Sequence, residues 1–167
     1  METTGNRNAA TIVHLSTFSQ WFFPFGNFIL PIIIWSSFKN KSAFIERHGR
    51  NVINFELSLL LYGIIAAVIA IPILIYSIAS KVSVDKTFHG DFVFNSDWTW
   101  ADIAGWPSLV IVIAAMYGLM KVAEFFLVIL AAVKAANGQD YQYPLTINFI
   151  KEHQQEPTIS EPVSSTE

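Results

Sequence analysis

The sequence predicts an all-α, polytopic membrane protein with about three transmembrane segments, the first of them kinked or re-entrant. Of its 167 residues, 53% are hydrophobic and only 14% are charged, whereas soluble domains average about a quarter charged. The apolar residues fall in three blocks, at about residues 12–38, 52–79 and 106–136, each of a length that can cross a bilayer. A soluble domain of this size could not bury so much apolar surface. We therefore expect lipid to surround these segments.

The first apolar block, at residues 12–38, follows a polar N-terminal tail at residues 1–11 and is interrupted by helix-bending residues. These are Pro24, Gly26, Asn27 and Pro31. Two geometries fit: a single kinked span, which we favour, or a re-entrant hairpin that turns at residues 24–27. Each arm of the hairpin would be about 18 Å long, less than the thickness of the hydrocarbon layer. A kinked span leaves the N-terminus outside the cell, whereas a hairpin leaves it in the cytoplasm.

The second apolar block, at residues 52–79, has no charged residue in its middle, from residue 57 to 78. It is long enough to cross the membrane with some tilt. Pro72 lies inside this block and is expected to bend the helix, because neighbouring helices can satisfy the freed carbonyl in a membrane bundle.

The third apolar block, at residues 106–136, has helix signals at both ends. Pro107 suits the first turn of a helix, where its missing N–H costs little, and Asn137-Gly138 is a typical helix stop. Small side chains allow membrane helices to approach closely. A close-packing face is therefore expected at Ala114, Ala115 and Gly118.

The two loops differ in charge. The loop at residues 39–50 carries four basic residues against one glutamate, whereas the loop at residues 80–105 has two lysines against four aspartates. The positive-inside rule therefore places loop 39–50 and the C-terminus in the cytoplasm of a bacterial cell, and loop 80–105 outside its inner membrane. The aromatic-rich external loop could form a short hairpin or a flap on the membrane surface. The polar tail at residues 151–167 is expected to be disordered.

Two charged residues, Lys121 and Glu124, interrupt the third apolar block near its middle. They are three residues apart, so they share one face of a helix. A charge at the centre of the bilayer costs on the order of 3 kcal/mol, and such residues usually face the interior of a bundle. The pair could serve as an ion or proton relay or as a docking point for a partner helix. It could also be a local ion pair that only neutralises itself.

Three further polar residues lie near the expected cytoplasmic ends of the second and third spans. Glu56 is about one turn inside the second span, at a depth that matches Lys134 in the third, so the two could pair across helices. Asn54 could hydrogen-bond to a neighbouring helix, a contribution of about 0.6 kcal/mol. Alternatively, Glu56 is an interfacial carboxylate close to water.

The sequence offers no catalytic or metal-binding motif. It has no cysteine, which excludes disulfides and thiolate chemistry, and its net charge of −3 gives no basic face for nucleic acid. His14, His48 and His89 are expected to be separate, solvated or interfacial residues rather than a ligand set. We therefore expect no enzyme activity, no metal and no cofactor.

Two ordered sets of short motifs, around residues 24–56 and 131–147, give the chain a family resemblance. The sequence resembles a widespread bacterial family of small membrane proteins that is distantly similar to the twenty-kilodalton Tic import component of plastids. The residues that carry the resemblance are Pro24, Gly26, Asn27, His48, Gly49, Asn54, Phe55, Lys134, Asn137, Gly138, Tyr143 and Pro144. The resemblance implies a helical membrane protein with its basic loop in the cytoplasm.

Two functions fit these observations. The first is an accessory or structural subunit of a bacterial membrane complex, with the lipid bilayer and another membrane protein or a second copy of the chain as its partners. The second is a component of a protein or solute transport assembly, which the resemblance to the plastid family implies. Three helices are too few to enclose a pore, so this second role would require oligomers.

Overall fold

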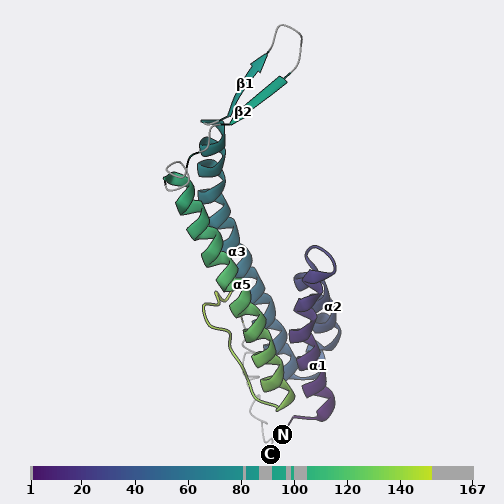
Figure 1. The fold of residues 1–167 in the computed structure, drawn as a ribbon. Coiled ribbons are helices and arrows are strands. Elements are labelled where there is room, and N and C mark those ends of the chain that lie inside the picture. Colours follow the sequence, from purple (N-terminus) through teal and green to yellow (C-terminus); the bar gives the residue numbers. More distant parts are fainter. Residues whose placement is uncertain (1, 81, 87–91, 97–98, 100–104, 152–167) are drawn as a thin grey trace, which may run out of the picture.

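The structure, a computed structural model, describes residues 2–80, 82–86, 92–96, 99 and 105–151. Its elements are, in order, α1 (Thr4–Leu15), the 3-10 helix η1 (Ser16–Trp21), α2 (Gly26–Phe38), the 3-10 turn η2 (Lys39–Lys41), α3 (Ala43–Ala79), β1 (Val82–Lys86), β2 (Phe92–Ser96) and α5 (Trp106–Ala136). Helices α3 and α5 form a long pair, and α1 and α2 pack against its lower half (Figure 1). The predicted all-α fold class is confirmed, with the two short strands as a small addition.

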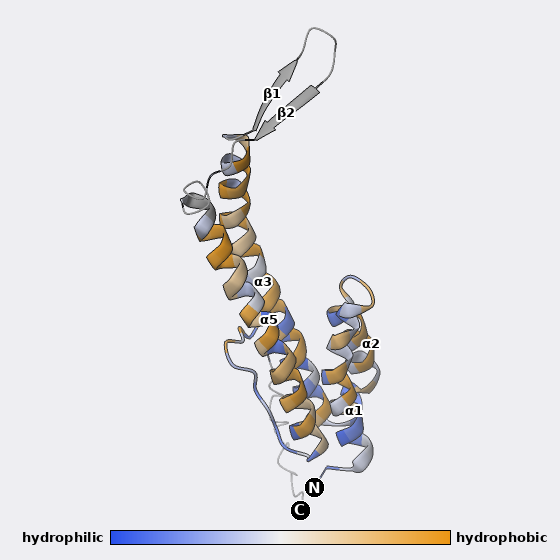
Figure 2. Cartoon of the chain, viewed as in Figure 1, coloured by the Kyte–Doolittle hydropathy of each residue, from blue (hydrophilic) through white to orange (hydrophobic). Residues whose placement is uncertain are grey.

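Among the described residues, two helices can cross a membrane: α3 and residues 108–136 of α5 are both long and apolar enough. Only 11% and 6% of their most apolar stretches are buried inside the protein, so neither is the core helix of a soluble domain. Hydrophobic residues continue along both helices above the bundle (Figure 2). So large an exposed apolar surface is stable only when lipid covers it. The chain is therefore a membrane protein, as its composition predicts.

The first apolar block folds as a helical hairpin, and the single kinked span that we favoured is wrong. Helix α1 is followed by η1 and a turn, and α2 then runs back beside them (Figure 1). Phe25 in this turn has φ 61, a left-handed conformation that reverses the chain instead of bending one continuous helix. Helix α2 has 13 residues and is therefore about 20 Å long, too short to cross the bilayer. Pro31 lies inside α2 without ending it.

Local signals set the ends of the two long helices. The hydroxyl of Ser42 accepts a hydrogen bond from the N–H of Phe44 at 3.1 Å and so caps the start of α3. Pro72 lies inside α3, which continues to Ala79. Helix α5 ends at Ala136, and Gly138 follows with φ 73, which is the stop that Asn137-Gly138 predicts.

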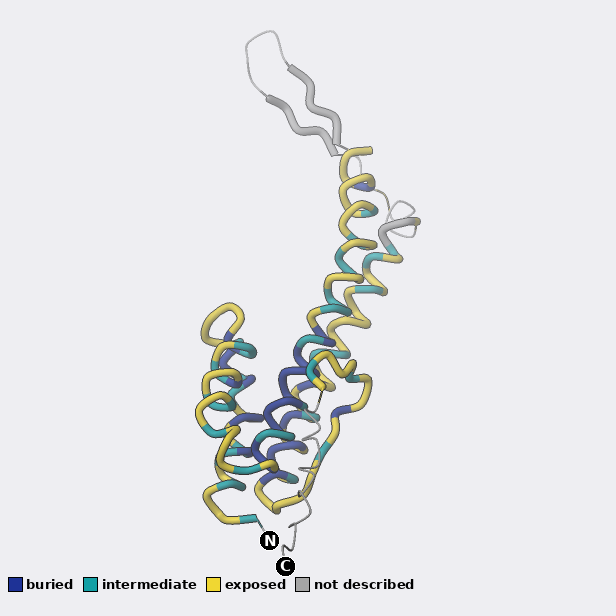
Figure 3. Tube along the Cα trace, turned by 180° about the vertical axis from the view of Figure 1, so that it is seen from behind, coloured by how far each residue is buried: buried dark blue, intermediate teal, exposed yellow. Residues whose placement is uncertain are grey.

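The buried core lies at the end of the molecule where α1, α2, α3 and α5 meet, and the upper parts of α3 and α5 are largely exposed (Figure 3). Residues 139–150 leave α5 and run back along α3 without regular secondary structure (Figure 1). The core cluster is formed by Val13, Val52, Phe55, Leu59, Val128, Ala131 and Tyr143. We call this packed end the base and the upper α3–α5 pair the shaft.

Strands β1 and β2 form an antiparallel hairpin beyond the end of α3, with Val82 opposite Ser96 and Lys86 opposite Phe92 (Figure 1). A short hairpin is one of the two forms that the sequence predicts for the external loop. The other predictions for this loop concern residues outside the described ones, as does the prediction of disorder beyond residue 151.

Candidate functional site

Five polar side chains meet inside the base near the tip of the α1–α2 hairpin, and we call them the carboxylate cluster. Lys121 forms an ion pair with Glu124 one turn further along α5. Its ammonium also donates to Oε1 of Gln20 at 3.0 Å, and Nε2 of Gln20 donates to Oε1 of Glu124 at 2.8 Å. These three residues thus close a hydrogen-bonded ring between η1 and α5. Asn27 and Glu56 complete the cluster.

Glu56 of α3 has one partnered and one unpartnered oxygen. Asn27 Nδ2 donates to Oε2 at 2.7 Å, whereas Oε1 is buried and accepts no hydrogen bond. The side chain is 1% exposed, and that of Glu124 is 2% exposed. The two carboxylates are close enough for their charges to interact. An acidic pair with one open oxygen therefore lies in the interior of the membrane domain.

The structure extends one prediction for this cluster and corrects another. Lys121 and Glu124 do pair on one helix, as their spacing predicts, but Gln20 also joins them. Glu56 does not pair with Lys134, because Glu56 lies level with Glu124 and Lys134 is in the last turn of α5. Sequence reasoning missed Gln20, and it gave Asn27 only a helix-bending and family-motif role. The available signal is that both are amides within the apolar block at residues 12–38.

A second network, which we call the histidine network, lies between the cluster and the surface at the base. Nδ1 of His14 is 2.7 Å from the hydroxyl of Tyr143, and Nε2 of His14 is 2.7 Å from Nδ1 of His48. His14 is 0% exposed and His48 1%. On the outer side, Nε2 of His48 faces Asp140 Oδ1 at 3.9 Å, and Arg47 holds that carboxylate with two nitrogens.

The prediction of separate, solvated histidines is wrong for His14 and His48. A kinked span would have put His14 on the side of the membrane opposite to loop 39–50, where His48 lies. The hairpin instead brings α1 back to the end of the molecule that carries this loop, so the two rings meet. The error therefore follows from the choice between the two geometries of the first block. His89 lies outside the described residues.

Tyr143 is part of the core and not a surface anchor. Its ring stacks on Phe55 with centroids 4.1 Å apart and planes 7° from parallel. Burial raises the pKa of Tyr143 well above its ordinary value. The phenol therefore stays protonated and can donate a hydrogen bond. Pro144 follows it in a turn, where Leu145 has φ 58.

A row of polar side chains on α3 fixes the segment after α5. Asn54 forms two hydrogen bonds with Ile150, one from its Nδ2 to the carbonyl at 3.1 Å and one from the backbone N–H to its Oδ1 at 2.8 Å. Asn51 and Tyr62 donate to further carbonyls, and Ser58 accepts from the N–H of Ile147. Asn54 was predicted to bond to a neighbouring helix, but its partner is the backbone of the segment after α5. This backbone has no neighbouring strand, so side chains of α3 satisfy its polar groups.

Several other residues of the quoted motifs have packing or chain-reversal roles. A Cβ at Gly49 would lie 2.1 Å from the Trp35 ring, so only glycine lets α2 and α3 approach this closely. Pro24 lies in the hairpin turn, and Asn137 caps α5 through Nδ2, which donates to the carbonyl of Val133 at 3.0 Å. These are roles in folding rather than in chemistry.

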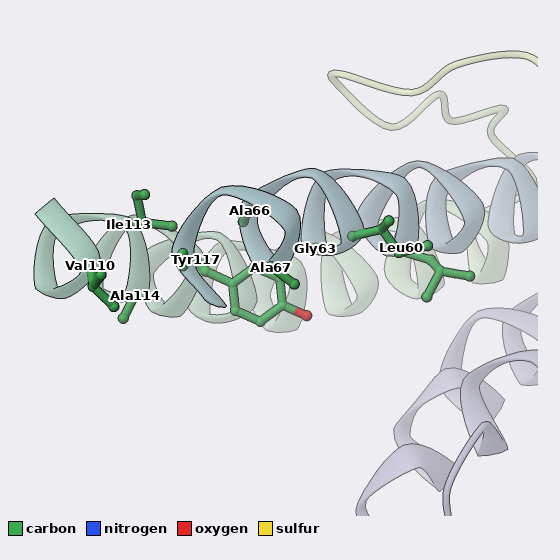
Figure 4. A pocket seen from close by; sticks show the side chains of 10 residues that line it. Leu60, Gly63, Ala66, Ala67, Val110, Ile113, Ala114 and Tyr117 are labelled. Carbon is green, nitrogen blue, oxygen red and sulfur yellow. The ribbon is translucent and has the colours of Figure 1, made fainter. Parts of the chain in front are cut away.

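The shaft has an apolar groove of about 430 Å³ between α3 and α5 (Figure 4). Gly63 and Ala67 line it from α3, and Ala114 and Tyr117 line it from α5. The predicted close-packing face is therefore only partly used, because Gly118 has no atom within 4 Å of the position of a Cβ. The hydroxyl of Tyr117 is the one side-chain polar group among the residues that line this groove.

Among the described residues, no three histidine, aspartate or glutamate side chains are grouped so that they could hold a metal ion. A family model described as "Magnetosome magnetite crystal formation protein family" (MamF/MmsF) matches residues 5–150. No curated protein and no solved structure matches the chain.

The family match overturns the predicted resemblance to the bacterial family similar to the plastid Tic component. The quoted motifs serve turns, helix ends and close packing in this structure. Any small helical hairpin that packs on two long helices needs such residues, so the motifs could not distinguish one family from another.

Proposed function

This chain belongs to the MamF/MmsF family, and from that premise we propose that it is a non-enzymatic, membrane-embedded accessory protein in the formation of magnetite crystals. The family match over residues 5–150 is the observation that carries the proposal. The structure supports an accessory role because the polar groups of the base hold its elements together. They connect η1 to α5, α2 to α3, α1 to α3, and the final segment to both α1 and α3.

The proposed location is the bacterial inner membrane or the magnetosome membrane, with the base on the cytoplasmic side. The base carries Lys39, Lys41 and Arg47, and short basic loops remain in the cytoplasm. The hairpin geometry then places the N-terminus there too, together with the end of the final segment. The β1–β2 hairpin lies at the opposite end of the shaft and would be exposed on the other face of the membrane (Figure 1).

The proposed partner is another membrane protein or a second copy of the chain. The shaft presents two apolar helix faces with small residues, and Gly118 is open to a neighbouring helix. The alternative role in protein or solute transport depended on the plastid resemblance. Because the family match overturns that resemblance, we do not propose this role.

The test is deletion of the gene in a cell that makes magnetite, followed by electron microscopy of the crystals. We expect fewer, smaller or misshapen crystals, and restoration by the wild-type gene. A Gly5→Ala gene should also restore the crystals, because the added methyl group meets only the Thr3 hydroxyl at 4.0 Å. A Gly49→Leu gene, whose product cannot pack beneath Trp35, should not. Normal crystals in the deletion strain would refute the proposal.

Fluorescent tagging at each terminus tests the location independently. We expect both tags to be accessible from the cytoplasm, because the hairpin returns the N-terminus to the base. A tag that reports the N-terminus outside the cytoplasm would exclude this orientation.

A further inference from the structure

We propose that the carboxylate cluster is a buried proton-binding site, with the proton on Glu56, and that the histidine network connects it to the surface at Asp140. This activity does not depend on the role in crystal formation, so each can fail without the other. The inference rests on the charge balance of the cluster, on the open oxygen of Glu56 and on the hydrogen bonds that join Tyr143, His14 and His48.

The charge balance of the cluster requires one more positive charge. Its ionisable groups are two carboxylates, Glu56 and Glu124, and one ammonium, Lys121. Lys121 is bound to Glu124, so one negative charge remains on a residue that is 1% exposed. An uncompensated charge in such a place is strongly unfavourable. The open Oε1 of Glu56 is where a compensating group would bind.

A proton fits this position better than a metal cation. A hard cation prefers six or more oxygen ligands, and Glu56 offers only one free carboxylate oxygen. The ammonium of Lys121 also repels a cation and occupies the second carboxylate. The remaining members of the cluster, Asn27 beside Glu56 and Gln20 beside Glu124, are neutral amides. A protonated Glu56 therefore leaves the cluster neutral.

The hydrogen bonds of the histidine network have a defined direction. Tyr143 keeps its proton and donates to Nδ1 of His14, so His14 carries its own proton on Nε2. That proton is donated to Nδ1 of His48, which then carries its proton on Nε2, the nitrogen that faces Asp140 Oδ1 at 3.9 Å. If His48 Nδ1 donated to His14 instead, Nε2 of His48 would be unprotonated and would face the carboxylate oxygen of Asp140. All three donors thus point from the interior to the surface.

This direction is suited to the release of a proton from Glu56. The Nε2 proton of His48 leaves toward Asp140, whose side chain is 64% exposed, and the Nε2 proton of His14 moves to Nδ1 of His48. The phenol proton of Tyr143 moves to Nδ1 of His14, and the Glu56 carboxyl proton replaces it on the phenol oxygen. One proton leaves Glu56 and one appears at the surface. No direct hydrogen bond joins Glu56 to Tyr143, so this step needs a water molecule or a rotation of the Glu56 side chain. The last step also needs a water molecule or a side-chain rotation, because His48 Nε2 and Asp140 Oδ1 are 3.9 Å apart.

Infrared spectroscopy of the full-length protein in lipid membranes tests the proposal directly. We expect the carbonyl band of a protonated carboxylic acid at neutral pH, and its loss in Glu56→Gln. After transfer to heavy water, the band should shift as the proton exchanges for deuterium. Tyr143→Phe, which keeps the stacking on Phe55, should slow this exchange by about a hundredfold, a typical loss when a positioned acid–base group is removed.

A second variant and a control make the test specific. His48→Gln interrupts the network at its outer end and should also slow exchange. Tyr117→Phe removes a phenol hydroxyl in the groove of the shaft and should exchange at the wild-type rate. Circular dichroism confirms that each variant is folded before the measurement. A wild-type protein without the band, a band that persists in Glu56→Gln, or wild-type exchange in folded Tyr143→Phe would each overturn the proposal.

Discussion

The base and the shaft of this protein differ in how their polar groups are kept away from lipid. In the base, a short helical hairpin covers the long helices, and polar groups can be buried because four helical elements surround them (Figure 3). In the shaft, α3 and α5 have only each other and lipid, and the described side chains that line their groove are almost all apolar. Polarity inside a membrane therefore depends on how many protein elements shield it from lipid. The free energy of unfolding should therefore be sensitive to substitutions in the base and tolerant of them in the shaft.

The largest effect is expected at the ion pair of the carboxylate cluster. Lys121→Leu leaves Glu124 buried without its ammonium partner, and breaking such a pair costs about 3 kcal/mol of unfolding free energy. The double variant Lys121→Leu/Glu124→Leu removes both charges and should lose only about 1 kcal/mol, because the amide of Gln20 is left unpaired. Reversible unfolding in mixed micelles measures both values. Equal losses of unfolding free energy in the single and double variants would show that the ion pair of Lys121 and Glu124 does not stabilise the base.

Close packing at the base should come next. Gly49→Ala puts a methyl group 2.1 Å from the Trp35 ring, so α2 must move away from α3 at a cost of about 2 kcal/mol. Gly118→Ala is the matched control in the shaft, where nothing lies within 4 Å of the added methyl group. The same unfolding measurement should leave the control unchanged. If both substitutions are neutral, the hairpin does not pack on α3 as closely as the structure shows.

The sequence was sufficient to predict the class of the fold because lipid exposure leaves a strong pattern. The long apolar blocks identify α3 and α5, and Pro107 and Gly138 mark the ends of α5. The geometry of the first block was harder to predict, since Pro24, Gly26 and Asn27 fit a kink and a turn equally well. The decisive residue is Phe25, which adopts the left-handed conformation in place of the adjacent glycine. No local rule assigns that conformation to a phenylalanine.

The candidate site was only partly predictable for the same reason. Lys121 and Glu124 are close in sequence, so their spacing on one helix was enough to pair them. His14 and His48 are 34 residues apart, and His14 and Tyr143 are 129 apart. Such contacts depend on how whole elements pack, which the single kinked span described incorrectly. The family match, by contrast, needs many weak similarities over residues 5–150, which the short motifs could not supply.

The most direct comparison of the two regions comes from the same alanine-to-leucine substitution made in each, and its effect in the shaft should be small. Ala131 of α5 is 0% exposed in the core of the base, so Ala131→Leu should force neighbouring side chains apart and cost about 2 kcal/mol. Ala67 of α3 lines the groove of the shaft, where a larger apolar side chain has space, so Ala67→Leu should change stability by less than about 0.5 kcal/mol. Both are measured by unfolding in the same micelles. A loss at Ala67 as large as that at Ala131 would mean that a second molecule fills the groove, because the chain itself leaves it open.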